Sequence, residues 1–385
     1  MIFLDSASGT RPYPEVIETI TDIITNHWGN ASADYSFGQD AKMIIDSVTE
    51  QVASDINCKP EEIIWTSGAC EANSLAIDGY IKYVNNLCHE RVGLCMSRLE
   101  HTSMHELYSH FNYVDGNRLY FVENSKDGFI LINDLENILK SYGTEYKKLV
   151  TISFANSEIG TVQDIKSIAK VVHQYDGIIH VDATQVYPWQ RIDVQELGID
   201  MMSVSGQKLH CIKGIGFLYV REGIELSPLI YGSQQDGRRG GTYPTHLIAA
   251  FGKALEITRK RNAAEKVCAL RGQLMDSMQH IDGLTFNGPI STYTYRLPNI
   301  ISATIDGVDA DQLVAMCDEY GFMIAKGSAC QSYNPVPSKT LRAIGLTEKQ
   351  ALSTIRISLD EFNTSYEMEY VCDILPKIIE RLRAI

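Results

Sequence analysis

Apolar residues recur along residues 60–220 in two alternating patterns. Short runs rich in β-branched and aromatic residues predict strands, and the stretches between them, with apolar residues three or four positions apart, predict helices. The predicted strands are Glu62–Thr66, Val92–Ser97, Arg118–Val122, Leu149–Phe154, Ile178–Asp182, Met201–Val204 and Gly216–Val220, and the predicted helices are Cys70–Val84, Thr102–Phe111, Leu131–Ser141 and Ile165–Tyr175. This alternation is typical of an α/β domain with helices on both faces of a mostly parallel sheet, here seven-stranded.

The pattern changes after about residue 255. Two helical stretches, Ile248–Asn262 and Glu265–His280, precede a strand, a helix, another strand and a last helix at Ser365–Arg383. Because 385 residues exceed the size at which one core stops growing, we expect two domains. The predicted large domain spans residues 15–255. Residues 1–14 and 256–385 form the predicted smaller α+β domain, and a helix near residues 246–262 joins the two.

Composition excludes several classes of function. A formal net charge of −14 argues against direct nucleic-acid binding, which needs a basic face. No apolar run approaches the ~18 residues of a membrane helix, and the first residues do not resemble a signal peptide. Nine cysteines without a Cys-x-x-Cys pair favour reduced thiols over disulfides or structural zinc. We therefore expect a cytoplasmic protein that binds no membrane and no metal.

Chemistry is expected in the loops that follow the predicted strands, because open parallel sheets bind ligands beyond the carboxyl ends of their strands. Ser67-Gly68-Ala69 opens a helix whose free N–H groups can cradle a phosphate. Asp182 ends one strand, and Lys208 follows the next. Pyridoxal phosphate needs these parts: a helix terminus for its phosphate, a carboxylate for its pyridine nitrogen and a lysine that holds its aldehyde as an imine.

A thiol and an amine stand on separate loops. Cys330 lies in the small-residue stretch Gly327-Ser328-Ala329-Cys330, and Lys208 lies in Ser205-Gly206-Gln207-Lys208. The amine can bind a carbonyl covalently, and the thiolate can attack or receive a group. This pair predicts covalent chemistry in two steps.

Ordered motifs along nearly the whole chain carry a resemblance. They are Leu4-Asp5-Ser6-Ala7-Ser8, Gly29-Asn30-Ala31-Ser32, Thr66-Ser67-Gly68-Ala69-Cys70-Glu71, Glu100-His101, Asn156-Ser157-Glu158-Ile159-Gly160, Asp182-Ala183-Thr184-Gln185, Ser205-Gly206-Gln207-Lys208, Arg239-Gly240-Gly241-Thr242, Gly327-Ser328-Ala329-Cys330 and Ile355-Arg356-Ile357-Ser358. The chain resembles the cysteine desulfurases of the NifS/IscS type, within the class V aminotransferases, a family of fold-type I pyridoxal phosphate enzymes. The loop after Cys330 resembles the long loop of the members that hand sulfur directly to partner proteins.

The resemblance implies a cofactor site. Lys208 would hold the cofactor, Asp182 would pair with its pyridine nitrogen, and His101 would stack on its ring and move protons. Gln185 would bond the ring hydroxyl, and the phosphate would be surrounded by Ala69, Cys70, Ser205 and Gln207. Thr242 would reach the phosphate of the other subunit, which implies a homodimer.

It also implies a substrate and a reaction. Arg356 would grip the carboxylate of L-cysteine in a two-pronged pair, in a substrate site that also contains Asn156, Ser157 and Asn30. Cys330 would attack the substrate sulfur, leaving L-alanine and a persulfide. An acceptor protein would then take the sulfur for iron–sulfur assembly, tRNA thiolation or DNA phosphorothioation.

Four positions depart from the family pattern. Cys70 stands where the family usually has Thr, Ser157 where it has Asn, and Gln207 where it has His, while Asn30–Ala33 replaces Asn-Pro-Ser-Ser. They indicate a divergent desulfurase. Cys70 also raises the hypothesis of a second reactive thiol beside the cofactor.

Two other functions stay open. One is a different reaction on the same scaffold, such as selenocysteine lyase, cysteine sulfinate cleavage or aminotransferase activity. The other is a non-enzymatic sulfur-relay or scaffold protein. Cys330 argues against transamination, which needs no thiol there, and the joint presence of Lys208, Asp182, His101, Cys330 and Arg356 argues against a scaffold.

Overall fold

A seven-stranded sheet forms the centre of the larger part of the molecule. The computed structural model describes residues 1–111, 116–290, 295–327 and 337–384. The sheet order is β2-β8-β7-β6-β5-β3-β4. Its strands are β2 (Ile63–Thr66), β3 (Arg91–Ser97), β4 (Arg118–Val122), β5 (Tyr146–Ser153), β6 (Gly177–Asp182), β7 (Met201–Ser205) and β8 (Gly216–Val220). All seven predicted strands are thus confirmed within three residues at each end.

Strand direction agrees with the predicted mostly parallel sheet. The neighbours β4, β3, β5, β6 and β7 run parallel, whereas β8 runs antiparallel to both β7 and β2. Both faces of the sheet are buried. On β5, Val150 and Ile152 pack into one apolar core and Leu149 into another, which is why apolar residues of this strand point to both faces of the sheet.

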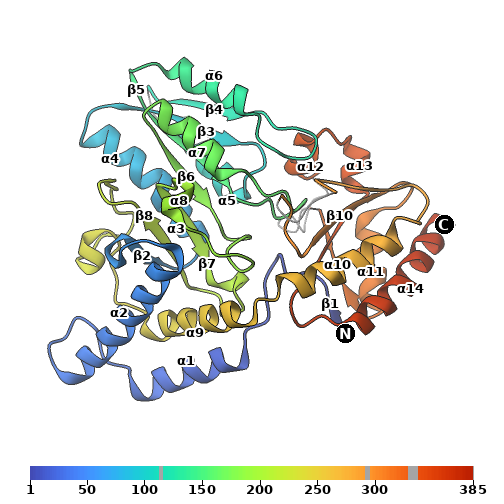
Figure 1. The fold of residues 1–385 in the computed structure, drawn as a ribbon, viewed down its shortest axis with the longest axis horizontal. Helices are drawn as coiled ribbons and strands as arrows, with labels where there is room; N and C mark the ends of the chain where they lie inside the picture. Colours follow the sequence, from blue (N-terminus) through green and yellow to red (C-terminus); the bar gives the residue numbers. More distant parts are fainter. Residues whose placement is uncertain (112–115, 291–294, 328–336, 385) are drawn as a thin grey trace.

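Helices cover both faces of this sheet (Figure 1). Three of the predicted helices are α5 (Thr102–Phe111), α6 (Ile132–Tyr142) and α7 (Ile165–Gln174), and a short α8 (Val194–Leu197) precedes β7. The predicted helix Cys70–Val84 is present as three consecutive segments, α3 (Ala69–Ser74), the π-helical turn η2 (Leu75–Gly79) and α4 (Tyr80–Asn86). Single 3₁₀ turns are η1 (Pro60–Glu62), η3 (Gly206–Lys208) and η4 (Gln234–Gly237).

Two N-terminal helices pack against α9 (Thr245–Arg261) on one side of the large sheet (Figure 1). They are α1 (Pro14–Asn26) and α2 (Ser36–Ile56), which the analysis of residues 60–220 does not cover. The predicted helix near residues 246–262 is α9. It leads from the large sheet toward the C-terminal part of the chain.

The C-terminal part has its own apolar core and its own antiparallel sheet, ordered β12-β13-β10-β9. Its elements are α10 (Ala264–Met278), β9 (Leu284–Phe286), β10 (Ile300–Ile305), α11 (Ala310–Glu319), β11 (Phe322–Met323), β12 (Ala325–Lys326), α12 (Lys339–Ala343), α13 (Glu348–Leu352), β13 (Thr354–Ser358) and α14 (Ser365–Arg383). The chain's first strand, β1 (Ile2–Phe3), pairs with β11. The division into domains at residues 15 and 255 stays a prediction.

None of the described helices is both long and apolar enough to cross a membrane.

Candidate active site

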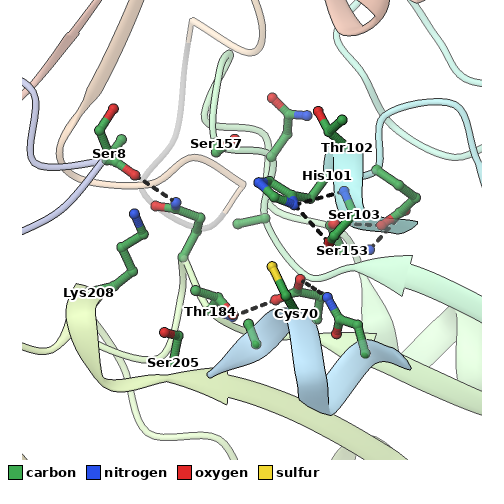
Figure 2. Close-up of a pocket in the computed structure, with 18 of the residues that line it drawn as sticks. Ser8, Cys70, His101, Thr102, Ser103, Ser153, Ser157, Thr184, Ser205 and Lys208 are labelled. Atoms are coloured by element: carbon green, nitrogen blue, oxygen red, sulfur yellow. Dashed lines mark hydrogen bonds between the residues drawn. The ribbon is translucent and has the colours of Figure 1, made fainter. Parts of the chain in front are cut away.

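A cavity of about 430 Å³ lies at the carboxyl ends of the parallel strands (Figure 2). Its walls come from the turns after β2, β3, β5, β6 and β7, from the N-terminal segment and from β13 of the C-terminal part. The lining residues are Ala7, Ser8, Ser67, Gly68, Ala69, Cys70, Glu71, Asn73, Leu99, Glu100, His101, Thr102, Ser103, Ser153, Ala155, Asn156, Ser157, Glu158, Asp182, Thr184, Gln185, Ser205, Gln207, Lys208, Gly214, Gly327, Thr340 and Arg356. The position agrees with the rule for open parallel sheets.

The turn from β2 into α3 is built for close backbone approach. Gly68 has φ +147°, which favours glycine, and a Cβ at Gly216 on the neighbouring strand would come within 2.8 Å of the Gly68 Cα. Glu71 fixes the helix start, because it accepts a hydrogen bond of 2.7 Å from the Ser67 N–H and pairs with Arg239 Nε at 2.7 Å. The N–H groups of this helix start are therefore available to an anion.

Asp182 ends β6 with a firmly oriented carboxylate. Its Oδ2 accepts from Asn73 Nδ2 at 2.8 Å, and its Oδ1 accepts from the Thr184 N–H at 3.0 Å. Two residues earlier on the same strand, His180 bonds to hydroxyl groups of both neighbouring strands at 2.7 and 2.8 Å. Burial lowers the pKa of His180 to about 4, so its ring is neutral at pH 7. The Asp182 carboxylate is thus held by two neutral partners, the Asn73 amide on α3 and the Thr184 N–H after β6.

His101 follows β3 and faces the cavity together with Lys208 and Cys70 (Figure 2). Its Nδ1 lies 3.2 Å from the Ser103 N–H, which donates to it, and 2.9 Å from the Ser103 hydroxyl. An Nδ1 that accepts a backbone hydrogen bond leaves the proton of the neutral ring on Nε2. The bond therefore selects one tautomer of His101.

Glu100 is a buried carboxyl group in the same wall, and it was not among the predicted site residues. It accepts from the Ser153 N–H at 2.9 Å and from the Ser153 hydroxyl at 2.6 Å. Burial raises the pKa of Glu100 to about 8, and the nearby Asp182 charge adds to the effect. Its position directly before His101 at a strand end is the sequence signal that could have identified it.

Lys208 is the last residue of η3, the 3₁₀ turn that follows β7. The N-terminal segment crosses this turn. The carbonyl of Gln207 accepts from the Thr10 N–H at 3.1 Å and from its hydroxyl at 2.9 Å. Gln185 Nε2 donates to the Ala7 carbonyl at 3.1 Å. Residues 7–10 therefore hold the lysine turn against the large sheet.

Arg356 projects from β13 and is almost completely buried. Its Nη2 donates to Asp5 Oδ1 at 2.6 Å and to the Ser8 hydroxyl at 2.8 Å, and its Nη1 donates to the Ser157 carbonyl at 3.2 Å. The Nε atom is buried and has no hydrogen-bond partner among the described residues. A buried donor in this state is available for an anionic ligand.

Asn156 lines the cavity, but its side chain is used within its own loop. Its Nδ2 donates to the Leu99 carbonyl at 2.9 Å, and its Oδ1 accepts from the N–H groups of Glu158 and Ile159 at 2.8 and 2.9 Å. Every strong hydrogen-bonding position of this amide except one N–H is thereby engaged. Asn156 shapes the loop that Ser157 and Glu158 occupy.

Most of the predicted site residues meet in this cavity. The structure brings together Ala69, Cys70, His101, Asn156, Ser157, Asp182, Gln185, Ser205, Gln207, Lys208 and Arg356. Thr242 and Asn30 are exposed and are not among the lining residues, and Asn30 Oδ1 accepts from the Ser32 N–H at 3.0 Å. Cys330 lies outside the described residues. The predicted roles of all these residues stay predictions.

The donor set fits the group that the resemblance implies. A helix start, an oriented carboxylate and a lysine surround one cavity, as a phosphate, a ring nitrogen and an aldehyde require. Two further buried oxygens, Asn73 Oδ1 and Thr184 Oγ1, have no partner among the described residues, so a polar ligand could satisfy them. In the described part of the chain, no group of three or more His, Cys, Asp or Glu side chains is placed to hold a metal.

Comparison with known proteins agrees with the fold. The family model described as aminotransferase class-V matches residues 2–371. A protein named cysteine desulfurase IscS from Clostridium botulinum is 32% identical over 386 residues, covering 99% of this chain and 95% of its own. The X-ray structure of a NifS-like protein from Rickettsia africae is 27% identical with a TM-score of 0.87, covering 99% of both chains. A structure of SspA in complex with cysteine is 30% identical with a TM-score of 0.81, covering 94% of this chain and 100% of its own. This chain therefore belongs to the class V aminotransferase family.

Proposed function

We propose that this protein is a pyridoxal phosphate-dependent cysteine desulfurase, which converts L-cysteine to L-alanine and takes the sulfur onto Cys330. The observation that carries the proposal is the single cavity in which Lys208, Asp182, His101 and Arg356 all meet. Similarity along the whole chain to proteins named cysteine desulfurase supports the same reaction.

The residues that would hold the cofactor occupy the sheet side of the cavity. Lys208 would bind its aldehyde, Asp182 its ring nitrogen, and the helix start at Ala69 and Cys70 its phosphate, together with Ser205 and Gln207. When bound, pyridoxal phosphate supplies an electron sink for the carbanion that forms at the cysteine α-carbon. The bonds from Asn73 and Thr184 fix the orientation of the Asp182 carboxylate, which would hold a proton on the ring nitrogen.

Arg356 would bind the carboxylate of the substrate. Its buried Nε has no partner among the described residues, and Nη1 uses one of its two N–H groups on a carbonyl at 3.2 Å, so the guanidinium can still donate hydrogen bonds to an anion. Lys208 and His101 would move protons at the substrate carbons. The bond from the Ser103 N–H fixes the His101 ring with its proton on Nε2.

The sulfur step needs a thiolate, which Cys330 would supply. The thiolate attacks the sulfur of bound cysteine, so that a sulfur–sulfur bond forms while the carbon–sulfur bond breaks. The electron pair of the broken bond stays on carbon and is protonated there. Cysteine and one thiol thus give alanine and one persulfide without an external oxidant.

We also propose a homodimer that passes its sulfur to an acceptor protein in the cytoplasm. Thr242 is exposed and is not among the residues that line its own chain's cavity, which supports a role in the other subunit's site. Exposed aromatic side chains, including Trp28 and Phe37 with ring centroids 5.3 Å apart, supply apolar surface for association. Iron–sulfur assembly, tRNA thiolation and DNA phosphorothioation are the candidate destinations of the sulfur.

One assay tests the reaction. The purified protein should be yellow and, with cysteine and a reductant, should form sulfide and alanine in equal amounts. Lys208→Ala should lose the absorbance of the lysine-bound cofactor, and Cys330→Ser should lose sulfide release. An undiminished rate in Cys330→Ser would refute the nucleophile, and a keto acid formed without sulfide would identify an aminotransferase. Absence of any turnover in the yellow protein would favour a sulfur-relay role.

A further inference from the structure

The carboxylate of Glu158 joins three separate parts of the cavity wall. Glu158 follows β5 in the loop 156–160, and its Oε2 accepts a 2.5 Å hydrogen bond from the hydroxyl of Ser338. Thr340, two residues further on, also lines the cavity and favours the ionised form of this carboxylate. Ser338 is the N-cap of α12, where its Oγ accepts from the Leu341 N–H at 3.2 Å. Glu158 therefore fixes the start of α12 against the large sheet.

Gly327, the last described residue before the Cys330 segment, lies beside the same carboxylate. Gly327 lies so close to α12 that a Cβ there would come within 2.7 Å of Leu341 Cδ1, and within 3.7 Å of Glu158 Oε2. Its N–H donates to the Thr354 carbonyl at 3.1 Å. The last described residue before Cys330 and the first residues of α12 after it therefore meet around one carboxylate.

The loop that carries Glu158 also touches the proposed substrate site. The Ser157 carbonyl accepts from Arg356 Nη1 at 3.2 Å, and the Asn156 side chain holds the Glu158 N–H at 2.8 Å. Burial raises the pKa of the Glu158 carboxyl group to about 7. The hydrogen bond from Ser338 and the positive charge of Arg356 oppose this shift but do not cancel it. Burying a carboxyl group is costly unless its hydrogen-bond partners compensate for the lost water.

We propose that Glu158 is a positioning residue for sulfur transfer: by holding Ser338 at the start of α12, beside Gly327 and the loop that contacts Arg356, it sets where both ends of the Cys330 segment stand relative to the substrate. The proposal rests on the proposed desulfurase function. Glu158 itself makes and breaks no bond. Its effect is on the approach of the Cys330 sulfur to the cysteine sulfur, a geometry in which an error of about 1 Å can cost roughly 10²-fold in rate.

The test compares two substitutions of similar size in the dimeric, cofactor-loaded enzyme. Glu158→Leu removes the acceptor, whereas Glu158→Gln keeps an oxygen that can accept from Ser338. Persulfide on Cys330 is measured by rapid quench and mass spectrometry, and cysteine binding is measured by the spectral change of the cofactor. We expect persulfide formation to slow roughly tenfold or more in Glu158→Leu and less than about threefold in Glu158→Gln, with cysteine affinity within about twofold in both.

A second comparison keeps the proposal testable if Glu158→Leu folds poorly. Ser338→Ala breaks the same hydrogen bond from the other side, so the double variant Glu158→Gln/Ser338→Ala should lose no more than Ser338→Ala alone. Wild-type persulfide rates in both Glu158→Leu and Ser338→Ala would overturn the positioning role. An equal loss of cysteine affinity and of persulfide rate would also overturn it, because it would indicate a general structural role. If the wild-type enzyme formed no persulfide, the proposed desulfurase function itself would be refuted.

Discussion

The two halves of the cavity are assembled in different ways. On the sheet side, Asp182 and Lys208 stand at the ends of adjacent parallel strands, and their positions follow from the ladder of backbone hydrogen bonds. On the opposite side, Arg356 is held by Asp5 and Ser8, which lie about 350 residues away in the chain. Arg356 also stands on an inner sheet strand, β13, but its guanidinium is oriented by a few long-range polar contacts.

This difference predicts which part of the reaction each half of the cavity controls. Residues fixed by a buried sheet can keep a cofactor in one orientation, because moving them would disrupt many hydrogen bonds at once. The direction of the Arg356 guanidinium depends on Asp5 and Ser8 of the N-terminal segment, so it can respond to substrate. Four predictions test this division, ordered from the largest expected effect to the smallest.

Asp182→Asn should cause the largest loss. The amide cannot hold a proton on the cofactor ring, although its size and its bond to Asn73 are preserved. We expect kcat to fall about 10³-fold, the scale on which removing a preorganised electrostatic partner acts, while Lys208 still binds the cofactor. Steady-state kinetics and visible absorbance check both parts. A loss of less than tenfold would contradict the assigned role of the carboxylate.

Arg356→Lys should act on substrate binding instead. An ammonium group cannot form the two-pronged pair, and it would leave Asp5 or Ser8 without its present partner. We expect KM for cysteine to rise about 10²-fold with a smaller change in kcat, and the cofactor spectrum to stay unchanged. Arg342→Lys, at an exposed position of α12, is the matched control, and it should leave KM unaltered. Equal KM values for the two variants would remove Arg356 from the substrate site.

Glu100→Gln should change the pH dependence of stability. Because burial raises the pKa of Glu100 to about 8, the folded state holds a proton that the unfolded state releases near pH 4.5. Stability from this group is therefore present below pH 4.5 and lost as pH rises toward 8. The free energy of unfolding, measured in urea at pH 6 and at pH 8.5, should fall between these two pH values in both proteins. The fall should be smaller for Glu100→Gln than for wild type, by about 1 kcal/mol. If the free energy of unfolding changed by the same amount between pH 6 and pH 8.5 in the two proteins, the Glu100 carboxyl group would be ionised in the folded state.

Cys70→Thr should have the smallest effect, and in the favourable direction. The thiol of Cys70 is a weak donor at the helix start, and a hydroxyl there would add one better hydrogen bond to the phosphate, worth about 1 kcal/mol. Cofactor release, followed by the loss of visible absorbance after dilution, should slow about threefold to fivefold. Cys70→Ala, which has no donor, is the control and should not slow release.

The strands of the large sheet could be predicted from sequence because each is a dense apolar run bounded by turns. The antiparallel direction of β8 was not predicted, although only residues 206–215 separate it from β7. That length is too short for the helical crossover that a parallel neighbour needs. The helices α1 and α2 also went unpredicted, since the pattern of residues 60–220 says nothing about them.

The site could be predicted where function resides in one motif and not where it depends on packing. Lys208, Asp182, His101 and Arg356 stand in recognisable motifs, and all four line the cavity. Glu100 and Glu158 also stand in these motifs, but their raised pKa values come from burial among residues distant in the chain, which the motifs do not record. The same holds for Asp5, whose partner Arg356 is 351 residues away.

The N-terminal segment has a practical consequence for handling the protein. β1 pairs with β11, Asp5 and Ser8 hold Arg356, and Thr10 bonds to the turn of Lys208. Anything fused to the exposed Met1 therefore begins only four residues before Asp5, which holds the Arg356 guanidinium that would bind substrate. A purification tag belongs on the other end of the chain, after α14, and kinetic constants obtained with an N-terminal tag should be remeasured after its removal.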